Sequence, residues 1–208
     1  MITLNLLSTV WLDSSYTASM TRDSAATKAR ILTAATAEFA ERGLAGARVD
    51  RLAASAGANK QLIYAYFGSK EALFDATLEA HLETLLDGVA FDASDLPGYA
   101  RRLFDFNLTH SDLGRLARWH TLERPGMLMQ LPVAAASIQR KLGLLAAEQA
   151  AGRIDDALPP MQLLVMLLAV IHADLIPPMP GISAAQQNAS QREAVALAVQ
   201  RLVARSGP

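Results

Sequence analysis

Residues 49–74 read VDRLAASAGANKQLIYAYFGSKEALF, and the organisation of the whole chain follows from them. The first part predicts a short helix over 49–56 with its apolar side chains on one face. Gly57 lies in a tight turn, and Asn59 is a good N-cap for a second short helix over 60–67. Two short helices joined by a glycine-containing turn are typical of a helix-turn-helix. Ser69 then caps a longer helix over 70–86.

Helical spacing continues on both sides of this motif. Convincing alternation is absent, β-branched residues are sparse and alanine is abundant. Before the motif, Thr27 can cap a helix that ends at Gly43. After it, Asp95, Asp112, Pro159-Pro160 and the capping-box pair Ser183 and Gln186 mark helix starts. We therefore expect an all-α protein of about nine helices. Two of the later ones begin at Asp95 and Asp112, and the last three lie near 133–151, 160–175 and 184–205.

The composition excludes several classes of protein. The 208 residues include no cysteine, which rules out disulfides, a thiol nucleophile and cysteine-ligated zinc, and which fits a reducing cytoplasm. Hydrophobic residues make up 51% and charged residues 19%, as in an ordered chain. The longest apolar run, 163–171, is too short to span a membrane. The net charge of −1 carries no overall signal for a polyanion. We expect a cytoplasmic location and no membrane partner.

The N-terminal residues have a different character. Residues 1–10 are fairly apolar but lack a basic stretch and a cleavage site, so we do not interpret them as a signal peptide. The segment up to Asp23 is rich in serine and threonine and has no helical period. We expect a flexible arm over 1–24, and either Met1 or Met20 as the true start. The expected domains are 25–75, which contains the helix-turn-helix, and 76–208.

The second short helix carries side chains suited to DNA. One side presents Lys60, Gln61, Tyr64 and Ala65, whereas Leu62, Ile63 and Phe67 can pack inward. Gln61 can bind an adenine edge through two hydrogen bonds, and Ala65 can contact a thymine methyl group. Lys60, Tyr64, Tyr66 and Lys70 can reach phosphates. Residues 20–75 hold eight basic and six acidic side chains, a small local excess of positive charge.

The sequence resembles the DNA-binding domain of TetR/AcrR-type transcriptional repressors. The matching residues are AG at 56–57, IY at 63–64, YF at 66–67, SKEAL at 69–73, and Ile31, Leu32, Phe39 and Gly43 upstream. The resemblance covers about residues 25–78. It implies an all-helical homodimer with a variable C-terminal ligand-binding domain. Arg48 stands where the family usually has threonine, so a helix cap is lost although a phosphate contact remains open. Leu62 replaces a small or hydroxyl residue.

These arguments give eight candidate DNA-binding residues. They are Arg48, Asn59, Lys60, Gln61, Tyr64, Ala65, Tyr66 and Lys70. The alternative is that the aromatic residues pack the core and the lysines are ordinary solvated charges.

By the same resemblance, the last two helices, about 159–175 and 184–205, pair with those of a second copy. Residues 163–171 are apolar on all sides, so one face needs a partner beyond its own core. The final helix carries a stripe of Val195, Ala198, Val199 and Leu202. The alternative is a purely intramolecular core.

The C-terminal part carries no motif of its own. The candidates for lining a ligand pocket are Phe104, Leu108, Trp119, His120, Met127, Met129, Met166 and His172. Few charges are expected inside, which favours a small apolar or weakly polar organic ligand. Plain core packing is the alternative for each residue. His172 and Asp174 do not share a helix face, so we expect no metal site, and no cofactor.

Three functions remain. The first is a ligand-responsive repressor that binds a near-palindromic operator as a homodimer and is released by a ligand. The second is an architectural DNA-binding protein without an effector. The third is a helical enzyme or carrier, which we disfavour because no nucleophile–base spacing or glycine-rich phosphate loop is present.

Overall fold

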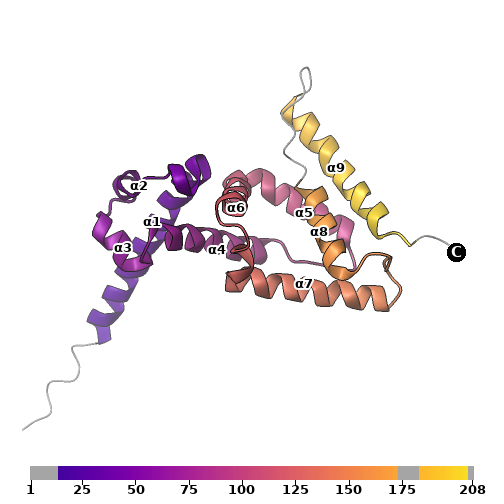
Figure 1. Cartoon of the computed structure of the whole chain (residues 1–208), viewed down its shortest axis with the longest axis horizontal. Helices are drawn as coiled ribbons and strands as arrows, with labels where there is room; N and C mark the ends of the chain where they lie inside the picture. The colour runs from indigo at the N-terminus through magenta and orange to yellow at the C-terminus, as the bar shows by residue number, and fades with distance from the viewer. Residues whose placement is uncertain (1–13, 173–182, 206–208) are drawn as a thin grey trace, which may run out of the picture. The chain divides into compact units, whose positions relative to one another are not determined.

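The computed structural model describes residues 14–172 and 183–205. These ranges contain nine α-helices, one short 3-10 helix and no strand, which confirms the all-α prediction (Figure 1). The chain divides into two compact units, Met1–Thr77 and Leu78–Pro208, and the division falls inside α4 (Lys70–Gly88). The two units are described separately below.

The first unit contains α1 (Ser14–Gly46), α2 (Val49–Ala56), α3 (Lys60–Phe67) and the start of α4. Ile31, Ala35 and Phe39, one turn apart along α1, are fully buried. The ring of Phe39 packs against that of Phe74, with the centroids 4.8 Å apart. These three residues form the apolar stripe of the first helix. Buried residues of α2, α3 and the start of α4 complete this core.

The beginning of α1 differs from our prediction. The helix begins at Ser14, so residues 14–24 are helical and not an arm, and Thr27 lies inside the helix, where its hydroxyl accepts a bond from Arg30 at 3.3 Å. No glycine or proline interrupts residues 14–27, and a helix that has nucleated extends through such a stretch. Residues 1–13 lie outside the described residues. The predicted stop at Gly43 is confirmed as a break in α1, with a φ of 65°.

The second unit contains the rest of α4 and the remaining helices. These are α5 (Leu96–Thr109), α6 (Ser111–Glu123), the 3-10 helix η1 (Leu128–Gln130), α7 (Pro132–Ala150), α8 (Pro160–Ile171) and α9 (Ala184–Val203). The predicted caps are confirmed at Asp95, whose carboxylate accepts the Gly98 N–H at 2.8 Å, and in the Ser183–Gln186 capping box. The sequence did not predict η1. Helix α8 ends at Ile171, short of the expected end at 175, which itself lies outside the described residues.

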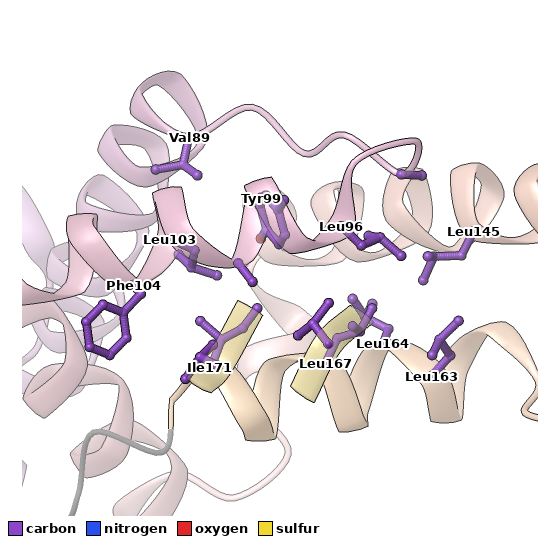
Figure 2. Packing of buried hydrophobic residues seen from close by; sticks show 14 of the residues in the cluster. Val89, Leu96, Tyr99, Leu103, Phe104, Leu145, Leu163, Leu164, Leu167 and Ile171 are labelled. Carbon is purple, nitrogen blue, oxygen red and sulfur yellow. The ribbon is translucent and has the colours of Figure 1, made fainter. Parts of the chain in front are cut away.

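A buried apolar cluster holds the second unit together. Figure 2 shows the two facing rows of side chains, which are Leu96, Tyr99, Leu103 and Phe104 of α5, and Leu163, Leu164, Leu167 and Ile171 of α8. Leu145 of α7 and Val195 and Val199 of α9 complete this core. Helix α5 packs along α9.

Ion pairs at the surface reinforce the contact between α5 and α9. Arg101 binds Glu193 at 2.9 Å, and Arg192 binds Asp105 at 2.8 Å. Arg192 also binds Glu193 at 2.7 Å, which links the two pairs into one network. Because the four side chains are 34–58% exposed, each pair contributes little alone, about 0–1 kcal/mol. The network therefore acts mainly on the register between α5 and α9 and adds little to stability.

Candidate functional site

Helix α2 is held in place by a carboxylate from α1. Glu38, whose side chain is 9% exposed, accepts the backbone N–H of Arg48 at 2.8 Å and the Nε of Arg51 at 3.0 Å. Burial alone would raise the pKa of Glu38, but the hydrogen bonds from Arg51 and Arg48 outweigh it and hold the pKa below its usual value. The Arg48 side chain makes no cap, as the sequence analysis expected.

The turn between α2 and α3 has the predicted chemistry. Gly57 is left-handed, with a φ of 59°, and its N–H closes α2 on the carbonyls of Ala53 and Ala54. Asn59 then caps α3, because its side-chain oxygen accepts the Leu62 N–H at 2.7 Å. Local bonds thus end α2 and start α3 within three residues.

Helix α3 turns one face to the core and one to solvent. Ile63 is 1% exposed, and Leu62 and Phe67 are half-buried. The exposed residues are Asn59, Lys60, Gln61, Tyr64 and Ala65. Tyr66 differs from these, since it is half-buried and the ammonium of Lys28 lies 5.3 Å from its ring centroid. That contact holds Tyr66 against α1.

A surface hollow of about 470 Å³ lies beside this exposed face. It brings together four of the candidate DNA-binding residues, Arg48, Lys60, Tyr64 and Lys70. The other four candidates, Asn59, Gln61, Ala65 and Tyr66, are not among its lining residues. The remaining lining residues are Ala47, Val49, Asp50, Gly68, Ser69 and Glu71. The hollow therefore collects basic and hydroxyl groups from three helices.

The electrostatics of the hollow suit a phosphate backbone. The N-terminal residues of α2 and α4 both line it, and helix N-termini carry partial positive charge. The ammonium of Lys70 donates to the carbonyl of Ala47 at 3.3 Å, which directs this side chain across the hollow. Three cationic side chains, a tyrosine hydroxyl and two helix ends can together bind phosphate oxygens.

Asp50 is a residue of this site that the sequence analysis missed. Its carboxylate lies 3.1 Å from the ammonium of Lys60, and both side chains are exposed. An acidic residue in the first turn of a helix is ordinary dipole compensation, so the sequence contained no signal for its place in the hollow. Any anion that binds Lys60 has to compete with Asp50.

The candidate ligand residues of the second unit are placed unevenly. Phe104 and His120 are buried, at 1% and 0% exposure. Trp119, Met127 and His172 are half-buried, and His172 shares its Nδ1 with the Leu168 carbonyl at 2.7 Å. Leu108, Met129 and Met166 are exposed. Among the described residues no group of metal-ligating side chains is assembled.

Helices α8 and α9 leave apolar side chains at the surface. Those of α8 are Met161, Val165 and Met166, and α9 adds Leu197. The expected stripe of α9 is placed differently, because Val195 and Val199 are buried against the unit's own core, whereas Ala198 is exposed. The reason is that α9 packs along α5, which covers the stripe. No helix in the described ranges is long and apolar enough to cross a membrane.

Comparison with known proteins agrees with this geometry. Residues 31–77 match the family of bacterial regulatory proteins called tetR, and residues 95–201 match the tetracyclin repressor-like C-terminal domain. The chain is 41% identical over 191 residues to the HTH-type transcriptional repressor SCO4008 of Streptomyces coelicolor, covering 88% of this chain and 98% of the relative.

Solved structures show the same fold. The regulator SCO4942 of Streptomyces coelicolor has a TM-score of 0.69 and 33% identity, over 86% of this chain and 99% of the other. FadR from Bacillus subtilis, solved in complex with stearoyl-CoA, has a TM-score of 0.64 and 18% identity, over 84% and 96%. The chain therefore belongs to the TetR family of bacterial transcriptional regulators, as the helix-turn-helix, the basic hollow and the matches over both units together show.

Proposed function

We propose that the chain is a ligand-responsive repressor that binds a near-palindromic operator as a homodimer. The observation that carries this proposal is the hollow in which Arg48, Lys60, Tyr64 and Lys70 converge beside the exposed face of α3. In the proposed complex these residues bind phosphates, while Asn59, Gln61 and Ala65 lie toward the base edges. Residues 25–75 form the DNA-binding domain, and 76–208 the ligand-binding and dimerisation domain. The chain acts by binding, in the cytoplasm.

A dimer explains how a short helix can select one site. Eight residues of α3 reach only a few base pairs, so a second copy is needed to lengthen the recognised sequence. Two recognition helices related by a two-fold axis would enter successive major grooves about 34–36 Å apart. The expected operator is therefore an inverted repeat.

The dimer interface is proposed on α8 and α9. The argument is their exposed apolar side chains, of which Val165 and Leu197 are 50% and 47% exposed. Covering these side chains with a second copy would remove apolar surface from water and so stabilise the dimer. The double variant V165E/L197E should be monomeric in size-exclusion chromatography with light scattering. Leu122→Glu, at a 73% exposed position of α6, is the control and should stay dimeric.

Ligand response is proposed for the second unit. Its candidate lining residues are those of the sequence analysis, with buried Phe104 and His120 as the interior pair. A ligand releases DNA only if it binds the DNA-incompetent conformation more tightly than the competent one. The expected ligand is a small organic molecule that is largely apolar.

The test is selection from a random duplex library with the purified protein and two variants. K60A/Y64A removes a basic and an aromatic side chain at i and i+4 of α3. R140A/L144A removes an exposed arginine and an exposed leucine at the same spacing on α7. We expect an enriched inverted repeat with the protein and with R140A/L144A, and none with K60A/Y64A. Equal enrichment with folded K60A/Y64A would refute the assignment of the hollow.

A further inference from the structure

Two polar residues lie on the buried face of α7. Ser137 and Lys141 are one helical turn apart, with exposed fractions of 9% and 8%. The other buried residues of this helix are Ala134 and Leu145. Lysine is almost never buried to this extent without a partner. This pair is the exception to the expectation that few charges lie inside the second unit.

Among the described residues, no protein acceptor binds either polar group. The hydroxyl of Ser137 is buried without a hydrogen-bond partner. Within the described residues, the Lys141 ammonium lies 5.8 Å from the ring centroid of Phe91, and no carboxylate pairs with it. Burial lowers the pKa of Lys141, and the charge of neighbouring Arg140 lowers it further. The environment therefore disfavours the ammonium that an anion would stabilise.

A buried cation is costly, and one aromatic face compensates only part of that cost. Methionine would fill the same space without any cost of desolvation. A hydroxyl and an ammonium at i and i+4 instead present two donors on the same side of the helix. A carboxylate has two acceptor oxygens, and it is the chemical group that matches this pair.

We infer that the effector of this regulator carries a carboxylate, bound by the Lys141 ammonium and the Ser137 hydroxyl, with its apolar part against Phe91. This inference rests on the proposed ligand response and specifies its chemistry. The ligand is then an organic acid with a largely apolar body. Binding would supply the missing acceptor to both donors at once, which makes the interaction selective for the head group.

Calorimetric titration of the full-length protein tests the head group directly. The probes are three compounds on each of two skeletons: decanoate, decanol and decylamine, and the naphthoic acid, alcohol and amine. We expect at least one carboxylate to bind about tenfold or more tightly than its alcohol and amine. Lys141→Met should abolish this preference, and Ser137→Ala should weaken carboxylate binding several-fold. Arg140→Met removes an adjacent exposed cation and should leave the preference for the carboxylate over the alcohol and amine in place.

Three outcomes would overturn the inference. The first is that the protein binds none of the carboxylates. The second is that Lys141→Met binds the carboxylate as tightly as the unaltered protein does. The third is that Arg140→Met loses the preference for the carboxylate as fully as Lys141→Met does. A thermal scan of the ligand-free protein gives an independent result, because Lys141→Met should raise the unfolding midpoint by a few degrees. A clear decrease would mean that Lys141 serves the fold.

Operator release is measured separately, on the selected duplex. A carboxylate that binds through Lys141 without releasing DNA upholds this inference and contradicts the proposed ligand response. Release by the alcohol or amine, with no effect of the acid, upholds the ligand response and overturns this inference.

Discussion

Replacing Asp50 by asparagine should tighten DNA binding. In the DNA-free protein the Asp50 carboxylate forms an ion pair with the ammonium of Lys60 at 3.1 Å. In the proposed complex a phosphate takes that place, and the carboxylate is left facing an anion. An asparagine side chain at this position would have a similar shape and no charge, so Lys60 would be available to the phosphate from the start.

The magnitude follows from the exposure of the pair. The two side chains are 48% and 77% exposed, so breaking their ion pair costs about 0–1 kcal/mol. Repulsion between a carboxylate and a phosphate about 6 Å away in water adds about 0.7 kcal/mol before screening. Asp50→Asn should therefore strengthen binding by about 3–20-fold per protomer at low salt. It should also steepen the dependence of log K on log salt by about 0.9 per protomer.

Fluorescence anisotropy of a labelled duplex, titrated between about 50 and 200 mM salt, measures both quantities. Glu41→Gln is the matched control, because Glu41 also pairs with an arginine, Arg42, at 2.9 Å, but does not line the hollow. Adding Lys60→Ala to Asp50→Asn should return the salt dependence to its original slope. If Asp50→Asn and Glu41→Gln had the same affinity and slope as the unaltered protein, Lys60 would not lie at a phosphate.

Three further predictions concern stability. Burial would raise the pKa of Glu38, but its hydrogen bonds, chiefly from Arg51, lower it. The ionised carboxylate therefore contributes to the free energy of unfolding above the ordinary carboxyl pKa. This contribution is lost as pH falls through the lowered pKa of the folded state. Glu38→Gln should cost about 1.5–3 kcal/mol at neutral pH in denaturant unfolding and flatten the acid limb; equal stability would contradict this. Gly57→Ala should destabilise by about 1–2 kcal/mol because of its positive φ, whereas Gly143→Ala, in open space within α7, should stabilise by about 0.5–1 kcal/mol; shifts of the same sign would refute the argument. Burial raises the pKa of Tyr99 to about 12, so stability should fall as pH rises from 10 through that value, and Tyr99→Phe should remove this loss in pH-dependent unfolding.

The sequence predicted the helix-turn-helix closely because its signals are local. Asn59 and Ser69 accept N–H groups three residues ahead, and Gly57 needs only its own φ. The same reasoning misplaced the start of α1, since a stretch without breakers gives no signal for where a helix begins. Local chemistry predicts caps and turns, and it predicts unbroken helix ends poorly.

The residues that the sequence did not predict act across helices. Asp50 meets Lys60 ten residues away, and Glu38 meets Arg51 thirteen residues away on another helix. The side of α9 that is covered depends on where α5 lies, which no stripe reveals. Lys141 is buried by neighbours from elsewhere in the second unit, although its residue type suggests solvent. Periodicity can be read from the sequence, whereas contacts between residues on different helices can be identified only once the fold is known.

Glu38 has a consequence for how this regulator can be altered. In many helices the N-cap side chain accepts a backbone N–H of the first turn, which restricts the residue that can stand there. Helix α2 is tied to α1 through the backbone N–H of its N-cap residue, which every residue except proline can supply. Here the carboxylate of α1 accepts the Arg48 N–H, and the Arg48 side chain makes no cap. Position 48 is therefore a variable position at the edge of the hollow. Evolution or an engineer can exchange its side chain to adjust operator affinity, and the scaffold beneath it stays intact.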